Sequence, residues 1–206
     1  MCNNNKIFFI IIYMKVLELF SGTKSVGKVC EKLGWEVISL DLLFDATHKI
    51  NILDFDYKQY ANDEFDIVWA SPPCTQYSKI KTKGIRDIEG ANKIVLKTLE
   101  IIKYFNPTSW YIENPQTGLL KDQEFMKGLP FVDADYCMYG MPYRKRTRIW
   151  TNKIVCPLLC DRRCGSWVNG KHLANIGNGD PFYNSVRISS KEAYIIPERL
   201  VFELLL

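Results

Sequence analysis

The chain has 206 residues, of which 47% are apolar, so it is long enough to bury one sizeable core. Its 27 Lys and Arg against 23 Asp and Glu give a net charge of +4, which permits a polyanionic partner but does not demand one. An odd count of seven cysteines argues against a complete disulfide framework. We therefore expect an intracellular, non-secreted protein with free thiols.

The first residues carry an apolar run at positions 7–13. This run is too short to span a bilayer, which needs about 20 residues. It also lacks the small-residue cleavage site of a signal peptide, and a lysine follows almost at once. We interpret residues 1–13 as an N-terminal extension without membrane association. Met14 is an alternative start of the protein.

Apolar, β-branched runs then alternate with helix-like stretches, which is typical of an α/β fold with a mainly parallel sheet. We predict strands at residues 16–20, 35–40, 65–70 and 109–112, and helices at 24–33 and 91–105. A late antiparallel pair is expected between residues 136–141 and 148–151. From residue 153, Cys, Gly, Asn and Pro dominate. We therefore predict a catalytic core at residues 14–152 and a small loop-rich C-terminal subdomain at 153–206.

Three predicted strands end in residues that suit ligand binding or catalysis. The carboxyl ends of parallel strands form the ligand crevice of such a sheet. Gly22 follows the first strand and Asp41 ends the second, although a lone strand-Gly-helix turn is more often a plain connection. Cys74 follows the third strand in Ser71-Pro72-Pro73-Cys74. A lone cysteine is usually a small hydrophobe, but this position gives the thiol access to the crevice, so we consider it a candidate nucleophile.

Two later segments add charged groups. Glu113 opens the turn Glu113-Asn114-Pro115 at the end of another strand, where a solvated carboxylate is the plainer interpretation. A basic run is usually a solvated face. Alternation along an extended strand nevertheless predicts that Arg144, Arg146 and Arg148 share one side.

In this order the motifs resemble those of the cytosine-5 methyltransferase family. The likeness covers residues 15–150 and rests on four segments: Phe20-Ser21-Gly22, Pro72-Pro73-Cys74 followed by Ser78, Glu113-Asn114, and Arg144-Lys145-Arg146-Thr147-Arg148. The resemblance implies a Rossmann-like sheet that binds S-adenosylmethionine. It also implies DNA as the substrate, with a flipped or single-stranded cytosine, and a monomeric enzyme.

The resemblance further implies a role for each motif residue. The Cys74 thiolate attacks carbon 6 of cytosine and makes carbon 5 nucleophilic. Glu113 holds ring nitrogen 3, Arg148 contacts the base carbonyl, and Arg146 positions the nucleotide or the loop. The implied cofactor contacts are Phe20, Ser21, Gly22, Asp41, Asn51 and Pro72. The basic loop at residues 78–90 is expected to close over the base.

This chain departs from the family pattern at several positions. Thr75 follows the cysteine where the family has glutamine, with Gln76 one place later. Arg144 replaces the glutamine of the arginine motif, and Asn51 stands where an acidic adenine contact is common. The long target-recognition region is missing, and residues 187–197 match the family's next motif only weakly.

A cysteine-histidine segment stands in place of that region. Cys156, Cys160, Cys164 and His172 offer three thiols and an imidazole, which suit tetrahedral zinc. Their spacing is not that of a standard zinc finger, so separately packed free thiols remain the alternative. A zinc knuckle here would let the short tail contact DNA.

Other functions remain open at this stage. Ser71-Pro72-Pro73 also fits amino-group methyltransferases of DNA, except that Cys74 replaces their aromatic residue. Transfer RNA is an alternative acceptor for the same chemistry. A non-catalytic, methyltransferase-like protein that binds nucleic acid would have no use for the thiol, and retention of Cys74, Glu113, Arg146 and Arg148 argues against it.

Overall fold

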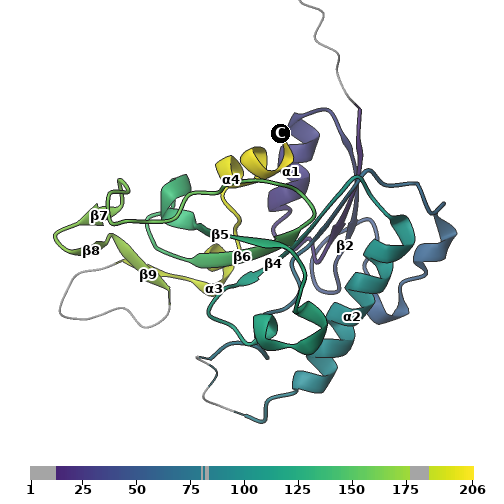
Figure 1. The fold of residues 1–206 in the computed structure, drawn as a ribbon, viewed down its shortest axis with the longest axis horizontal. Coiled ribbons are helices and arrows are strands. Elements are labelled where there is room, and N and C mark those ends of the chain that lie inside the picture. Colours follow the sequence, from purple (N-terminus) through teal and green to yellow (C-terminus); the bar gives the residue numbers. More distant parts are fainter. Residues whose placement is uncertain (1–12, 80, 82–83, 177–185) are drawn as a thin grey trace, which may run out of the picture.

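The computed structural model describes residues 13–79, 81, 84–176 and 186–206. Its centre is a sheet of six strands in the order β2-β1-β3-β4-β6-β5 (Figure 1). The strands are β1 (Lys15–Leu19), β2 (Glu36–Leu40), β3 (Ile67–Ala70), β4 (Ser109–Pro115), β5 (Phe131–Asp135) and β6 (Arg146–Thr151). The first four are parallel, and β6 runs antiparallel to both β4 and β5. The predicted α/β, Rossmann-like sheet is confirmed. The predicted N-terminal extension lies almost wholly outside the described residues.

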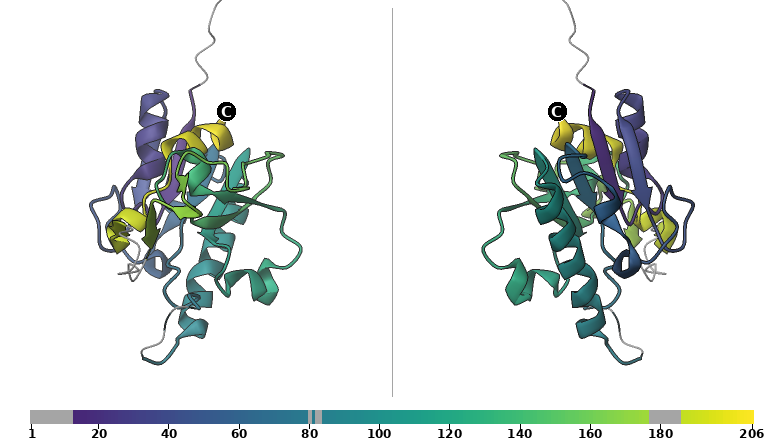
Figure 2. Two further views of the ribbon diagram at one scale, coloured as in Figure 1. Left: turned by 90° about the vertical axis from the view of Figure 1, so that its left-hand side faces the viewer. Right: turned by 90° about the vertical axis from the view of Figure 1, so that its right-hand side faces the viewer.

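Helices cover both faces of this sheet (Figures 1 and 2). One core cluster joins α1 (Ser25–Lys32) and α4 (Glu198–Leu205) to the sheet, and another joins α2 (Ile88–Phe105) to the opposite face. The strand β1 is buried on both sides, as its run of apolar residues requires. None of the helices among the described residues is long and apolar enough to cross a membrane.

Local sequence signals explain where the first two long helices begin and end. Gly34 adopts φ 77° just after α1, as predicted for a residue in the C-terminal cap. The Asp87 side chain accepts a hydrogen bond of 2.8 Å from the Gly90 amide and thereby caps the start of α2. Asn106 ends α2 in a left-handed conformation directly before Pro107. The predicted helices at 24–33 and 91–105 are therefore confirmed within three residues.

The predicted strand at residues 136–141 is wrong. Tyr136–Tyr139 forms a 3-10 helix, η5, that ends at Gly140 with φ 95°. The strand that pairs with β6 is instead β5, which sequence reasoning missed because two aspartates in five residues disfavour a strand. In the sheet Asp133 lies opposite Arg148, and cross-strand ion pairs compensate for the poor strand propensity of the aspartates.

Between β6 and α4 the described residues form short elements only, as expected of a loop-rich region. They are β7 (Trp167–Val168), β8 (Lys171–His172), β9 (Ala174–Ile176), β10 (Val186–Ile188) and α3 (Ser190–Ala193). The predicted boundary at residue 153 stays a prediction. Ile188, Ile196 and Leu200, which follow that boundary, are buried in the same core cluster as residues of α1.

In the part of the chain that the structure describes, the remaining elements are five short 3-10 helices, of which η5 has been described above. The others are η1 (Ile52–Asp54), η2 (Tyr57–Gln59), η3 (Leu120–Asp122) and η4 (Glu124–Met126). The first two connect β2 to β3, and the last two connect β4 to β5.

Candidate active site

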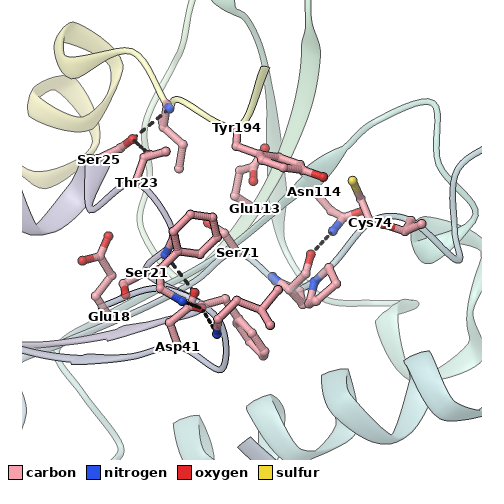
Figure 3. A pocket seen from close by; sticks show the side chains of 18 of the residues that line it. Glu18, Ser21, Thr23, Ser25, Asp41, Ser71, Cys74, Glu113, Asn114 and Tyr194 are labelled. Atoms are coloured by element: carbon pink, nitrogen blue, oxygen red, sulfur yellow. Dashed lines mark hydrogen bonds between the residues drawn. The ribbon is translucent and has the colours of Figure 1, made fainter. Parts of the chain in front are cut away.

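A cavity of about 320 Å³ opens at the carboxyl ends of β1 to β4 (Figure 3). Residues from the predicted cofactor and nucleophile motifs line it together, although they lie far apart in the sequence. The predicted residues among them are Phe20, Ser21, Gly22, Asp41, Pro72, Cys74 and Glu113. Lys145, Tyr194 and Ile196, which were not predicted, complete part of the wall.

The turn after β1 is built to bring backbone close to a ligand. Phe20 and Gly22 both have positive φ, 60° and 49°, so the chain bends sharply beneath the cavity. The Gly22 amide donates to Asp41 Oδ2 at 2.9 Å, and the Leu43 and Phe44 amides donate to Asp41 Oδ1 at 2.8 and 2.9 Å. Asp41 therefore fixes the ends of both β1 and β2.

Glu18 belongs to β1 and is more deeply buried. Its carboxylate lies against the first turn of α1. Its carboxylate accepts hydrogen bonds from the Val26 and Gly27 amides at 3.3 and 3.2 Å. A side chain at Gly27 would have its Cβ only 2.7 Å from Glu18 Oε2, so the close approach depends on glycine. Burial raises the pKa of Glu18 to about 7 despite these two donors.

The Pro-Pro-Cys loop, which follows β3, is hydrogen-bonded to β1 and β4, the two strands that flank β3. The Ser71 amide donates to the Leu19 oxygen at 3.2 Å, and the Asn114 side-chain amide donates to the Pro72 oxygen at 2.9 Å. Cys74 is half-buried. Its pKa is raised by burial and by the Glu113 carboxylate, whereas the charge of Lys145 acts in the opposite direction. In this arrangement the thiol stays protonated more readily than an isolated cysteine.

Glu113 is buried at the end of β4 among three donors. Its Oε1 accepts from the Tyr136 hydroxyl and from Thr147 Oγ1, both at 3.1 Å, and lies 3.5 Å from Lys145 Nζ. Lys145 also donates to the Ala193 oxygen at 3.1 Å, which joins the site to the C-terminal residues. No contact of Oε2 is present among the described residues, so that oxygen is available to a ligand.

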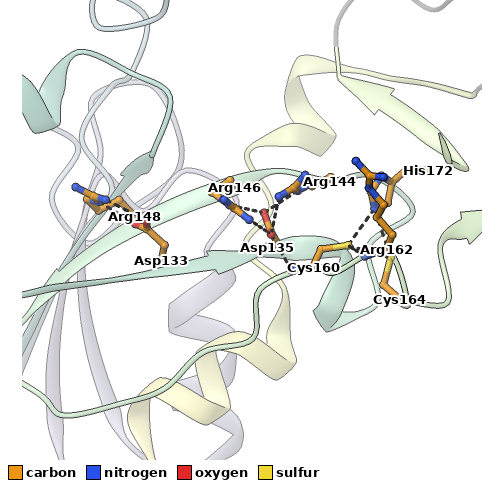
Figure 4. A network of polar contacts seen from close by, with 9 residues as sticks. All are labelled: Asp133, Asp135, Arg144, Arg146, Arg148, Cys160, Arg162, Cys164 and His172. Atoms are coloured by element: carbon orange, nitrogen blue, oxygen red, sulfur yellow. Dashed lines mark hydrogen bonds and ion pairs between the residues drawn. The ribbon is translucent and has the colours of Figure 1, made fainter. Parts of the chain in front are cut away.

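Arg146 and Arg148 are absent from the cavity wall. The predicted alternation is present, but it directs them to the far side of β6: Arg146 pairs with Asp135 at 2.7 Å and Arg148 with Asp133 at 2.8 Å (Figure 4). Arg144 also pairs with Asp135. The same alternation brings Lys145 and Thr147 to Glu113, and this was the sequence signal that could have identified them.

Asn51 is likewise absent from the residues that line the cavity. Its side chain accepts a hydrogen bond of 3.0 Å from the Leu53 amide and thereby caps η1. The amide oxygen has a second lone pair, so the implied adenine contact of Asn51 stays a prediction.

The loop after Cys74 is held largely by its own side chains. Arg86 donates to the Gln76 and Ser78 oxygens at 2.7 and 2.8 Å, and Gln76 Oε1 accepts from Lys81 at 2.6 Å. Among the predicted basic residues of this loop, Lys83 lies outside the described range. Arg86 is therefore a structural residue of the loop in this conformation.

A second cluster lies beyond the far end of β5. Cys137, Cys160, Cys164 and His172 bring their sulfur and nitrogen atoms within 4.8 Å of one another. Three of these four residues were predicted, but Cys156 is exposed and lies outside the cluster. Cys137 takes its place, and because it is 23 positions before Cys160 no local spacing rule pointed to it.

Comparisons with known proteins agree with the motifs. The family model described as "C-5 cytosine-specific DNA methylase" matches residues 14–127. The protein named "Probable DNA (cytosine-5)-methyltransferase" of Frog virus 3 (isolate Goorha) is 40% identical over 154 residues, covering 68% of this chain and 71% of that protein. The type II methyltransferase M.FnuDI of Fusobacterium nucleatum is 26% identical over 140 residues, covering 61% and 40%.

Two solved structures are also similar, at lower levels. A mutant of DNMT2 from Spodoptera frugiperda has a TM-score of 0.49 at 15% identity, and the match covers 71% of this chain and 55% of that one. The Dnmt2 methyltransferase of S. pombe has a TM-score of 0.48 at 13% identity, with 71% and 52% covered. The chain thus spans about half the length of these structures.

Proposed function

The chain belongs to the C-5 cytosine-specific DNA methylase family, and from this membership we propose that it transfers a methyl group from S-adenosylmethionine to carbon 5 of cytosine in DNA. The observation that carries the proposal is the meeting of Cys74 and Glu113 in one cavity. A nucleophile and a buried carboxylate at the ends of adjacent strands are what addition to a cytosine ring requires.

The residues of the cavity fit S-adenosylmethionine, the methyl donor of this family. Ser21 Oγ is buried and has no hydrogen-bond partner among the described residues, which suits a polar ligand atom. A carboxylate can accept about four hydrogen bonds, and three are present on Asp41, so it can still take one ribose hydroxyl. Phe20, Gly22 and Pro72 would complete the binding site. The bound cofactor supplies an electrophilic methyl group.

The reaction that we propose begins at Cys74. Its thiolate forms a bond to carbon 6 of the cytosine, and the electron pair of the ring double bond moves to carbon 5, which then takes the methyl group. Glu113 Oε2 would accept from the base while Oε1 is held by Tyr136 and Thr147. A base then removes the carbon 5 proton, the ring double bond re-forms, and the sulfur–carbon bond breaks.

Lys145 precedes the predicted Arg146 in the sequence and supports a different choice of cation. Its ammonium group lies 3.5 Å from Glu113 Oε1, and its charge opposes the rise in the pKa of the Cys74 thiol that burial and Glu113 cause. We therefore propose Lys145 as the cation that favours the thiolate and contacts the base. The two arginines, paired with Asp135 and Asp133 on the other side of β6, would have structural roles in the catalytic fold.

The target cytosine must leave a duplex, or be single-stranded, to reach a half-buried thiol. We propose DNA as the acceptor because the matched family model and the Frog virus 3 relative both name it. RNA would be accepted by the same chemistry. We propose that a single chain carries the complete site, because Cys74, Glu113 and Lys145 all line one cavity within it.

The test is capture of the covalent intermediate. The full chain is incubated with S-adenosylmethionine and a pool of duplexes in which 5-fluoro-2′-deoxycytidine replaces deoxycytidine, alongside a matched RNA pool. We expect a denaturation-resistant protein–DNA adduct that is lost in Cys74→Ser and kept in Cys156→Ser, an exposed thiol away from the cavity. An adduct formed only with RNA would overturn the DNA substrate, and absence of any adduct would overturn the carbon 5 mechanism.

A further inference from the structure

The cluster of Cys137, Cys160, Cys164 and His172 has the dimensions of a metal site. Cys160 Sγ lies 3.6 Å from Cys164 Sγ, and His172 Nε2 lies 3.5 and 3.4 Å from these two sulfurs. Tetrahedral zinc, with bonds of about 2.3 Å to sulfur and 2.0 Å to nitrogen, requires separations of about 3.8 and 3.5 Å. The distances among these three donors therefore agree with a single tetrahedral ion, and Cys137 Sγ lies within 4.8 Å of them.

The surroundings of the cluster also suit thiolate ligands. Cys137, Cys164 and His172 are buried, and Cys160 is half-buried. The Arg162 amide donates to Cys160 Sγ at 3.4 Å, which compensates a negative sulfur. Disulfide formation would require sulfurs about 2.05 Å apart, much closer than the observed pair. Three thiolates and an imidazole are the donor set that selects zinc among common divalent ions.

We infer that Cys137, Cys160, Cys164 and His172 bind one structural zinc ion that fastens the loop-rich region to the catalytic fold. This site is separate from the proposed methyl transfer. The four ligands come from three segments: η5, the turn at residues 160–164, and the β7–β8 hairpin. Zinc thus ties both later segments to η5, which directly follows β5.

The link reaches β5 and, through Asp135, the segment at residues 144–146 that includes the cavity residue Lys145. The Cys160 amide donates to Asp135 Oδ2 at 2.8 Å, and the same carboxylate holds Arg144 and Arg146 (Figure 4). A metal at Cys160 therefore fixes a loop against β5 and β6 at the edge of the sheet. This would give the loop-rich region a rigid surface.

The first experiment measures zinc in the full chain after purification without chelator. We expect about one equivalent per chain, unchanged in Cys156→Ser and lost in Cys137→Ser. These two variants distinguish the ligand set in the structure, which includes Cys137, from the ligand set predicted from the sequence, which includes Cys156. Less than about half an equivalent in the wild type, or loss of zinc in Cys156→Ser with retention in Cys137→Ser, would overturn the inference.

Cobalt substitution of the wild-type chain tests the site independently of whether the Cys137→Ser variant folds. A tetrahedral site with three thiolates gives intense visible bands and sulfur-to-cobalt charge transfer. We expect both signals at one equivalent of cobalt and their loss when zinc is added. A weak octahedral spectrum without charge transfer would contradict the site.

Discussion

The Asn114 side-chain amide donates a hydrogen bond of 2.9 Å to the backbone oxygen of Pro72. This bond joins the strand that ends in Glu113 to the loop that carries Cys74. The two proposed reacting groups are therefore placed relative to each other by one buried contact. Because both partners are buried in the protein, the contact is expected to persist in solution.

Replacing Asn114 by alanine should release the Pro-Pro-Cys loop. We expect kcat for methyl transfer to fall about 100-fold, since small displacements of reacting groups have effects of this size. The affinity for S-adenosylmethionine should fall less than kcat, because Pro72 is only one of its proposed contacts. The control is Asn152→Ala, because Asn152 also bonds to backbone at Trp110 and Thr108, but at the opposite end of β4. Equal losses of kcat in the two variants would contradict a specific role of the contact between Asn114 and Pro72 and would indicate a general disturbance of the sheet.

Replacing Lys145 by methionine should raise the pKa of Cys74 further, since the ammonium group is the neighbouring charge that lowers it. The acidic limb of the rate–pH profile, and of iodoacetamide alkylation of Cys74, should then move to higher pH. Arg146→Met removes a charge from the adjacent position on the other face of β6 and should leave the alkylation profile unchanged. A shift in Arg146→Met without one in Lys145→Met would restore the arginine as the catalytic cation.

The parallel half of the sheet could be predicted because each strand and helix has its own local signal. Buried runs such as β1 and β3, the cap at Gly34 and the break at Pro72-Pro73 depend on neighbours in the sequence. The positions of Gly22, Asp41 and Cys74 followed, since parallel strands bring their ends together.

The antiparallel half depends on partners that are distant in the sequence. The strand β5 is stabilised by ion pairs with arginines of β6, and these pairs determine which face of β6 meets Glu113. Motif matching predicted the catalytic positive charge on Arg146 and Arg148, whereas Lys145 and Thr147 are the residues that contact Glu113. Cys137 was missed for a similar reason, because its neighbours in the cluster come from another part of the chain.

Glu18 should make the stability of the ligand-free protein depend on pH. Its pKa is raised from 4.5 to about 7 in the folded chain, chiefly by burial. The unfolded chain therefore loses this proton first, and stability present below about pH 4.5 is lost as the pH rises towards 7, by about 3 kcal/mol. Urea unfolding of Glu18→Gln should lack this contribution in the same window. The same slope in wild type and variant would assign the pH dependence to another group.

Asp135 should contribute more to stability than Asp133, although both lie on β5 and both pair with arginine. The Asp135 side chain is fully buried and binds Arg144, Arg146 and the Cys160 amide, whereas that of Asp133 is 20% exposed and binds Arg148 alone. Burial acts to raise the pKa of Asp135, but the bonds from Arg146, Arg144 and the Cys160 amide outweigh it and hold that pKa below its usual range. We expect Asp135→Asn to lower the free energy of unfolding at pH 7 by about 3 kcal/mol and Asp133→Asn by about 1 kcal/mol.

Acidic pH should reduce the difference in the free energy of unfolding between the wild type and Asp135→Asn. A carboxyl whose pKa is lowered by folding stabilises the protein above its unfolded pKa of about 3.9, and that contribution is lost as the pH falls through the folded value. The gap between wild type and Asp135→Asn in urea unfolding should therefore narrow below about pH 4. If the gap stays constant across this range, the loss arises from altered packing, and the ion pairs of Asp135 do not account for it.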